Sequence, residues 1–498
     1  MKRFVLCAIS ASLIVGCADS SGIGPDDPGA GQNVTERLFD SAIGLLNRLS
    51  DVEGDEALVQ IGNRLNQWAA AQKPIVGWTV DPLVASLPAE LRDTPLMQSL
   101  GELKFASADA AMLRESVWVR EAARSAVGHE LDPLQRAKLL FDWTVRNLQL
   151  EADAATDESR TYLPWQTMLV GRAMAEERAW TFALLAREQG LDVVLLATGE
   201  GEALQVWLPA LVHDEKLWLF DAMLGLPIPG DEADSVATLT DAAENPTILE
   251  RLSVEGQPAY RVTAEQISQV TALVVASPQS LSQRMRLVES HLAGPQRLEL
   301  TVDASRLAAR LVKMPHVAQV QLWQVPIERS RNPGAKAREA WRRQLRPFHL
   351  MQGNWLWKGR VLEICGRLAG EDQALVCLMR ARPAEEDIAI ARENKQIDAS
   401  AEADIRIAKQ DASYWLGLAS YERGNFDAAI DWFSERTLAA SPGGPWTEGA
   451  RYNLARTYEA LDRRADAIRT YRSTQGAQRT GNLLRAQSLS RMLSKDSS

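Results

Sequence analysis

The chain has 498 residues, of which 46% are hydrophobic and 24% are charged, and its net charge is −10. This length predicts two to four domains, and the composition is that of a globular protein rather than a disordered one. The acidic balance argues against nucleic acid as a partner, because nucleic-acid binding requires basic patches. The basic run 329–346 is the exception, and we interpret it as the solvated face of a helix.

The N-terminus has the three parts of a secretory signal, namely a charged start, an apolar run over 4–15 and a small residue, Gly16, before Cys17. The apolar run is too short to span a bilayer. The tetrapeptide 14–17 (Ile-Val-Gly-Cys) resembles the bacterial lipobox. The resemblance implies that residues 1–17 form a lipoprotein signal peptide and that Cys17 is lipidated; the alternative is an ordinary signal peptide with an incidental cysteine.

The expected location is the cell envelope, where a lipid on Cys17 would hold the mature chain on a membrane, facing the periplasm. No aspartate directly follows Cys17, which favours the outer membrane over the inner. Residues 18–34 are rich in Gly, Pro, Asp and Ser and predict a flexible tether.

Residues 35–130 have the apolar spacing of helices, which Pro82, Pro88 and Pro95 divide into several short ones. Asp132 then begins a helix over 134–148, and a further helix ends at Gly190. The strands expected next are 191–197, 204–212 and 216–220, of which the last two form a hairpin around 213–215. Pro209 predicts that its strand lies at a sheet edge or carries a bulge.

Residues 251–384 predict a further α+β region, with strands at 297–302, 317–325 and 356–364 and a helix at 305–312. Cys365 and Cys377 are the cysteines that remain after signal removal. They are candidates for one disulfide in an oxidising periplasm, or else two core residues. No histidine lies between them, and the sequence predicts neither a metal site nor a cofactor.

The segment 131–250 resembles the transglutaminase-like fold of the papain-like superfamily. The resemblance rests on the helix-to-strand passage 179–191 (AWTFALLAREQGL) and on 218–221 (WLFD). In that family a cysteine opens the buried helix, a histidine comes from the following hairpin, and an aspartate ends the next strand. The corresponding positions here are Ala175, residues 201–203 (Gly, Glu, Ala) and Asp221, so only the aspartate is present.

Without a nucleophile and a base, acyl transfer has no route, and we expect a non-catalytic domain. Two alternatives stay open. One is a hydrolase or protease with a displaced nucleophile, or with a carboxylate site made of Glu176, Glu177 and Asp221. The other is a peptidoglycan- or glycan-binding module that uses some of the 15 tryptophans as stacking platforms.

Residues 385–498 are expected to be helical and contain two self-similar segments, 414–433 and 452–471, offset by 38 residues. Both resemble tetratricopeptide repeats, with small residues at Ala429 and Ala467 where helices would touch. Helices around 401–408 and 481–493 are expected to cap the array. In such repeats a concave groove binds a peptide or protein segment. The groove residues expected here are Tyr414, Leu418, Tyr421, Tyr452, Arg456 and Glu459; the alternative is that some of them pack against the neighbouring domain.

Together the segments predict an α+β protein: a helical N-terminal region, a transglutaminase-like domain, a further α+β segment and a helical repeat array. The function expected is that of an envelope-anchored, non-catalytic binding scaffold. Its partners would be a protein or peptide in the repeat groove and a membrane through the lipid.

Overall fold

The structure is a computed structural model that describes residues 28–48, 55–152, 163–232, 235–331, 334–350, 353–371 and 373–496. The expected signal peptide, with Cys17, and the first part of the tether lie outside the described residues. The tether prediction is wrong for residues 28–34, because helix α1 (Pro28–Leu46) begins at Pro28. Proline is tolerated in the first turn of a helix, where its missing N–H is not needed. Within the described ranges no helix is long and apolar enough to cross a membrane.

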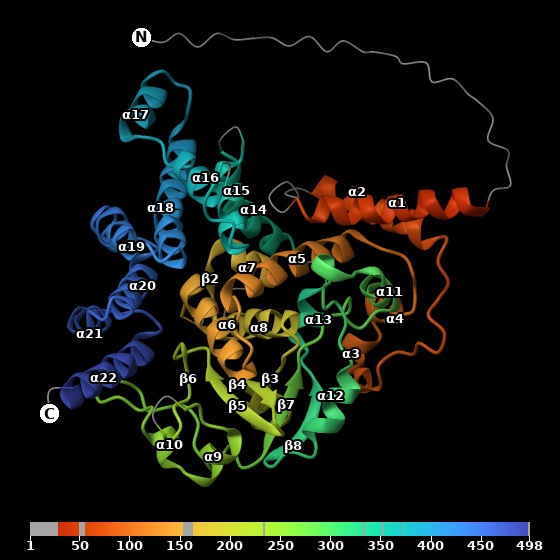
Figure 1. The fold of residues 1–498 in the computed structure, drawn as a ribbon, viewed down its shortest axis with the longest axis horizontal. Coiled ribbons are helices and arrows are strands. Elements are labelled where there is room, and N and C mark those ends of the chain that lie inside the picture. Colours follow the sequence, from red (N-terminus) through yellow and green to blue (C-terminus); the bar gives the residue numbers. More distant parts are fainter. Residues whose placement is uncertain are drawn as a thin grey trace.

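The fold is α+β and is built around a mixed sheet with the strand order β6-β5-β4-β3-β7-β8 (Figure 1). Neighbouring strands are antiparallel except β7 and β8, which are parallel. The strands are β3 (Asp192–Thr198), β4 (Gln205–His213), β5 (Lys216–Asp221), β6 (Leu226–Pro227), β7 (Val270–Val274) and β8 (Val317–Leu322). A second, two-stranded sheet pairs β1 (Gln149–Leu150) with β2 (Arg172–Ala173).

The expected hairpin is confirmed as β4 and β5, and its turn residues Asp214 and Glu215 have φ angles of 51° and 56°. The expectation that Pro209 marks an edge strand is wrong, since β4 lies between β3 and β5. The bulge expectation holds nearby: the pairing of β3 with β4 shifts register between Leu196 and Ala197. Pairing with β5 starts at Ala210, one residue after Pro209.

Helices from distant parts of the chain cover the sheet (Figure 1). One face packs against α5 (Ser107–Val127), α6 (Pro133–Asn147) and α8 (Ala175–Glu188) in the larger core. The opposite face packs against short elements from both sides of the sheet segment in a second core. These elements are η2 (Pro82–Ser86), α3 (Ala89–Arg92), α4 (Pro95–Gln98), α9 (Leu239–Glu244), α10 (Thr247–Glu250) and α12 (Ala304–Leu311).

The domain boundary predicted at 250/251 does not separate two structural units. Strand β7 pairs directly with β3 and continues the sheet to β8, so residues 270–322 complete the sheet of the preceding segment. The spacing of a hairpin predicts only the pairing of strands that are close in sequence. Strands β3 and β7 are about 75 residues apart, so no such spacing predicts that they pair.

The local signals in the helical segments are confirmed. Pro82 and Pro95 each open a short helix, and Pro88 precedes α3. The Asp132 side chain caps α6 by accepting the N–H of Gln135 at 2.8 Å. Gly190 has a φ angle of +68° after the end of α8, a backbone conformation that glycine adopts without strain.

Two strand predictions between 251 and 384 are wrong. Residues 297–302 form no strand, and 356–364 belong to helix α15 (Trp355–Ile364). That helix is buried on most of its surface, so its apolar run lacks the periodicity that separates a helix from a strand. The other helices of this half are α11 (Gln283–His291), η4 (Gly294–Gln296), α13 (Val325–Arg329), α14 (Ala335–His349) and α16 (Ala374–Arg380).

The C-terminal part is helical, as expected, and curves along one side of the sheet domain (Figure 1). Residues 401–408 do not form a separate capping helix, because they lie in the first half of α18 (Ala399–Glu422). The elements are α17 (Glu385–Glu393), α18 (Ala399–Glu422), α19 (Phe426–Phe433), the π-helical turn η5 (Ser434–Ala439), α20 (Thr447–Ala460), α21 (Arg464–Arg472) and α22 (Arg479–Asp496). The remaining helices, near the N-terminal half, are α2 (Asp55–Ala69) and α7 (Pro164–Val170).

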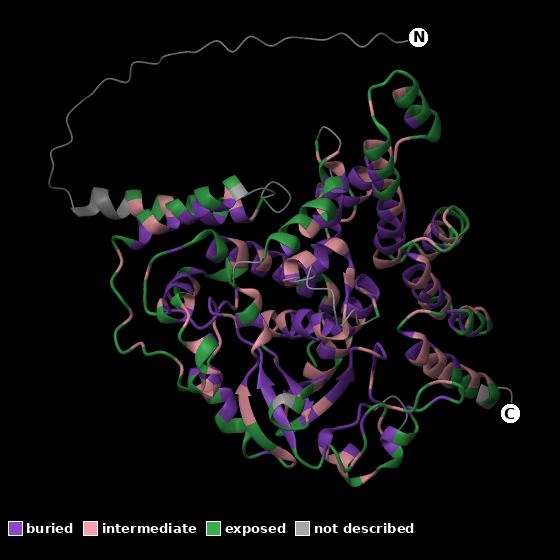
Figure 2. Ribbon diagram, turned by 180° about the vertical axis from the view of Figure 1, so that it is seen from behind, coloured by how far each residue is buried: buried purple, intermediate pink, exposed green. Residues whose placement is uncertain are grey.

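Three further expectations concern which residues are buried and which are exposed (Figure 2). The arginines and lysine of α14 are on the solvent side, so this part of the basic run is a solvated helix face, whereas Arg329, at the end of α13, is half-buried. Cys365 and Cys377 are both free and buried, so the disulfide prediction is wrong and the alternative of two core residues holds. Of the 15 tryptophans, nine are buried and six are half-buried, so a platform of the glycan-binding alternative would consist of side chains that are only partly open to solvent.

Candidate functional site

The first turn of helix α8 is where the family resemblance would place a nucleophile. Ala175 opens the helix, after the N-cap residue Met174. The carboxylate of Glu177 accepts the backbone N–H of Met174 at 3.0 Å and a hydrogen bond from Arg329 at 2.9 Å. Its side chain is 1% exposed. Glu177 therefore has a helix-capping role, and its oxygens are occupied by protein groups rather than turned to a substrate.

The three positions of the expected triad lie at one end of the sheet. Helix α8 runs to the turn at Gly190, and β3 returns along it. Strand β4 then leads away from this end and β5 leads back to it, because β4 is antiparallel to both β3 and β5. The strand directions therefore bring three elements to the same end of the sheet: Ala175, the short helix η3 (Gly201–Ala203) and Asp221.

The carboxylate of Asp221 is fully buried and is held by backbone and tyrosine donors. It accepts the N–H groups of Met223 and Leu224, both at 2.8 Å, and the hydroxyl of Tyr260 at 2.6 Å. The Tyr260 oxygen in turn accepts the indole N–H of Trp207 at 2.9 Å. Burial and the charge of Asp221 raise the pKa of Tyr260 well above 10, so its hydroxyl stays protonated and acts as a donor.

Asp221 also faces away from the helix that would carry the nucleophile. Side chains alternate along a strand, and the preceding residue, Phe220, packs against Phe182 of α8 with ring centroids 5.2 Å apart. Leu219 and the Asp221 partner Tyr260 belong to the core on the opposite face. Among the described residues, no cysteine or histidine is hydrogen-bonded to Asp221. Its carboxylate closes the turn after β5 through the N–H groups of Met223 and Leu224.

The concave face of the repeat helices is covered by the protein itself. Tyr414 and Leu418 of α18 are 0% exposed and Tyr452 of α20 is 4% exposed. Tyr421, Arg456 and Glu459 are half-buried. The expectation that these six residues line an open partner groove is therefore wrong. Helix α6 of the sheet domain occupies the position where a peptide would lie.

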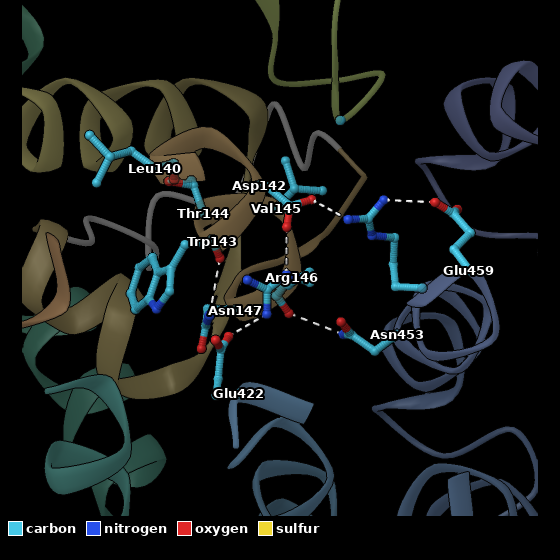
Figure 3. Close-up of polar contacts among 12 residues, drawn as sticks. Leu140, Asp142, Trp143, Thr144, Val145, Arg146, Asn147, Glu422, Asn453 and Glu459 are labelled. Atoms are coloured by element: carbon cyan, nitrogen blue, oxygen red, sulfur yellow. Dashed lines mark hydrogen bonds and ion pairs between the residues drawn. The ribbon is translucent and has the colours of Figure 1, made fainter. Parts of the chain in front are cut away.

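Arg146 of α6 is the centre of this contact (Figure 3). Its guanidinium pairs with Asp142, one turn earlier, at 2.8 Å and with Glu422 at the end of α18. The same guanidinium carbon lies 4.6 Å from the ring centroid of Tyr421. The two carboxylates overcome the effect of burial and raise the pKa of Arg146 above its ordinary value.

Asp142 links the same helix to α20 (Figure 3). Its second oxygen lies 2.9 Å from Arg456, which also pairs with Glu459 at 3.0 Å. Burial would raise the pKa of Asp142, but the positive charges of Arg456 and Arg146 outweigh it and hold the pKa well below the ordinary value. The charged groups on this face thus alternate in sign across the interface, and each has a partner.

Backbone groups complete the contact. The carbonyl at the C-terminal end of α6, that of Arg146, accepts the Asn453 side-chain N–H at 3.1 Å and the Tyr414 hydroxyl at 3.4 Å. The last carbonyls of a helix have no partner within the helix, and here two repeat side chains supply one. The repeat helices therefore close the end of α6, much as capping residues would.

Small residues let the repeat helices approach one another. A side chain at Gly417 would place its first carbon 2.5 Å from the Phe433 ring, so any other residue there would force α18 and α19 to shift. Ala429 and Ala467 are both fully buried, at the equivalent places in the two helix pairs. These are the helix contacts that the repeat pattern in the sequence predicts.

The sequence analysis did not identify Asp142 and Arg146 as interface residues. They stand four residues apart on one helix, a spacing that ordinarily indicates a solvated ion pair. A partial signal was present, because the apolar residues Leu140, Phe141, Trp143 and Val145 surround the pair in the second half of the helix and leave little surface for water there. The repeat partners, Glu422 and Arg456, are too distant in sequence for any local pattern to join them.

Among the described residues, no group of histidine, cysteine, aspartate and glutamate side chains could hold a metal ion. Comparison of the chain with protein-family models, curated proteins and solved structures found no match.

Proposed function

We propose that this chain is a non-catalytic binding scaffold, anchored in the bacterial envelope by a lipid on Cys17. It consists of a transglutaminase-like domain that lacks the nucleophile and base, and of a short tetratricopeptide-like array. Together they form one body that holds a protein partner. The observation that carries the proposal is the occupied concave face: α6 is bound between α18 and α20 through Arg146, Asp142 and Arg456.

The state of the expected catalytic positions supports a binding role. The helix start carries Ala175, and the carboxylate of Asp221 is saturated by two N–H groups and Tyr260 on the far face of the sheet. Hydrolysis through a carboxylate needs an oxygen free to reach substrate. Neither Asp221 nor Glu177 offers one, which argues against a carboxylate site built on these two residues; Glu176, beside Glu177 in the first turn of α8, is half-buried.

With the concave face covered, the surface left for a partner is the outer side of the repeat helices. Asp431 of α19 and Arg469 of α21 are charged and exposed to solvent. Photo-crosslinking residues placed at Asp431 and Arg469, in cells that make the protein, should give a discrete adduct. A residue placed at Arg251, on the exposed helix pair across the sheet, is the control. Adducts at Arg251 alone, or at none of the three positions, would contradict the proposal.

The anchor has its own test. Cys17→Ser should release the protein from membranes without changing its unfolding temperature, because the lipid would be the sole attachment. Fractionation at high salt measures this directly. A Cys17→Ser protein that still sediments with membranes would place the attachment on a protein surface instead.

A further inference from the structure

A cavity of about 150 Å³ lies where α17, α18 and the turn before α20 meet, away from the interface with α6. Its charged lining consists of four cationic side chains and one carboxylate, in a chain whose net charge is negative. The cations are Arg382, Arg406, Lys409 and Arg436, and the carboxylate is Glu385. Such a local excess of positive charge attracts anions.

Arg382 is the cation in this cavity without a carboxylate partner in the described structure. Its guanidinium donates to the hydroxyl of Ser413 at 2.8 Å and lies 4.7 Å from the ring centroid of Trp432. Both contacts are neutral. Burial and the neighbouring positive charge of Arg436 lower the pKa of Arg382, so the two arginines repel each other across the cavity. An anion between them would relieve that repulsion.

Two of the other cations share the one carboxylate of the lining, and Arg406 also pairs with Glu402 at 3.1 Å. Glu385 lies 2.7 Å from Arg406 and 2.8 Å from Lys409. Arg436 pairs with Asp431 at 3.4 Å, outside the cavity lining. The carboxylate of Glu385 therefore neutralises positive charge beside Arg406 and Lys409 and leaves the charge of Arg382 without a negative partner among the described residues.

The opposite wall adds a hydroxyl and the start of a helix. The Thr447 hydroxyl oxygen is buried and has no hydrogen-bond partner among the described residues. A buried polar atom without a partner is costly, and in native proteins it indicates a group that is satisfied by something else. Thr447 also begins α20, a helix of 14 residues with no side-chain cap at its N-terminus. That end of a helix carries partial positive charge.

We infer that this cavity is a binding site for a compact oxyanion, a carboxylate or a phosphate group, held by Arg382 and Arg436 with the Thr447 hydroxyl as a further donor. A planar guanidinium presents paired N–H groups that match both kinds of oxyanion. The site goes beyond the scaffold role and does not depend on it, since it lies apart from Ala175, Asp221 and the covered concave face.

The full mature chain can be tested by calorimetric titration with sodium phosphate and, separately, with sodium succinate, at an ionic strength kept constant with sodium chloride. We expect saturable binding of at least one anion above the chloride background. Binding of succinate alone would assign a carboxylate ligand, and binding of phosphate alone a phosphate ligand. No saturable binding of either would overturn the inference.

Variants then locate the site. Arg382→Gln should weaken binding about tenfold, the effect of losing one charge-assisted hydrogen bond. Arg436→Gln, which changes a half-exposed side chain and leaves the fold intact, should weaken it several-fold. Arg343→Gln removes an equal charge from the exposed face of α14 and should leave affinity unchanged. Equal losses in all three variants would mean non-specific charge attraction and would overturn the site.

A change in the opposite direction gives a result that misfolding cannot imitate. Glu385→Gln removes the one negative charge of the cavity lining and leaves its four cations in place, so the anion should bind several-fold more tightly. Unchanged or weaker binding by Glu385→Gln would contradict the proposed site, because the cavity would then not be the place where the anion is held.

Discussion

Two buried arginines hold helix α6 on its two sides, and they do so with different partners. Arg178 of α8 donates to the backbone carbonyls of Leu148 at 2.8 Å and Ala222 at 3.1 Å. Arg146 pairs instead with the carboxylates of Asp142 and Glu422. Burial lowers the pKa of Arg178 to about 10, whereas the carboxylates raise that of Arg146.

The difference separates two kinds of interface. Within the sheet domain, Arg178 satisfies carbonyls that the end of a helix and a turn leave without donors. Between the sheet domain and the repeats, charges of both signs face each other and must be buried together. Removing one member of such a set leaves an uncompensated charge behind. The repeat interface should therefore be the more sensitive to single substitutions and to acid.

The largest effect is expected from Arg146→Ala. The substitution leaves Glu422 without its arginine and leaves Asp142 paired with Arg456 alone. It should therefore lower the free energy of unfolding by about 3–5 kcal/mol. Urea unfolding measures it. Arg469→Ala, on the exposed side of α21, is the control and should cost less than about 0.5 kcal/mol. A loss below about 1 kcal/mol for Arg146→Ala would mean that the network adds little to stability.

Arg178→Met should cost less, about 2 kcal/mol, because it removes hydrogen bonds to carbonyls but leaves no charge unpaired. Since its partners do not titrate, we expect the cost to be the same at pH 4 and at pH 7. The same urea experiment at the two pH values decides this. A cost equal to that of Arg146→Ala would remove the distinction between the two sides of α6.

The acid response of the repeat interface should depend on Asp142. Its pKa is held well below the ordinary value by Arg456 and Arg146, so it contributes stability that is fully present above about pH 3.9. That contribution is lost as the pH falls from there towards the folded pKa. Asp142→Asn should therefore cost about 1–2 kcal/mol at pH 7 and progressively less below pH 4. A difference from the wild type that is constant from pH 7 to pH 3 would contradict the assignment.

The smallest effect on stability is expected from Ala175→Cys, at most about 0.5–1 kcal/mol, since the helix start is only half-buried. In a protein that lacks residues 1–17, and with them Cys7 and Cys17, the new thiol should react with a thiol reagent. The same protein with Ala175 should not react, because Cys365 and Cys377 are buried. No hydrolysis of amide or ester substrates should appear, since no imidazole accompanies the sulfur. Turnover by Ala175→Cys would show that a base is present after all.

Much of the local structure could be predicted from the sequence because its causes are local. The side chain of Asp132 caps its own helix, Pro82 and Pro95 begin theirs, and Gly190 ends α8 through a left-handed backbone conformation. The hairpin β4–β5 and the two helix pairs of the repeat segment follow from spacing within a few tens of residues. In each case the residues that decide the structure are neighbours in sequence.

The candidate site depended on contacts that such patterns do not contain. Ala175 and the residues 201–203 already indicated a missing nucleophile and base, but the side of the sheet on which Asp221 lies required the packing of Phe220 against Phe182. The apolar run 356–364 could not be assigned to a helix, since burial on most sides removes the periodic contrast between faces.

The repeat face shows the same division most clearly. Spacing along the chain placed Tyr414, Leu418 and Tyr452 on one side of their helices, and the structure keeps them together there. Whether that side met water, a partner or the rest of the chain was decided by α6, some 270 residues earlier in the sequence. Periodicity specifies which side chains share a face, whereas the occupant of a face follows from the tertiary packing of segments that no local interaction connects.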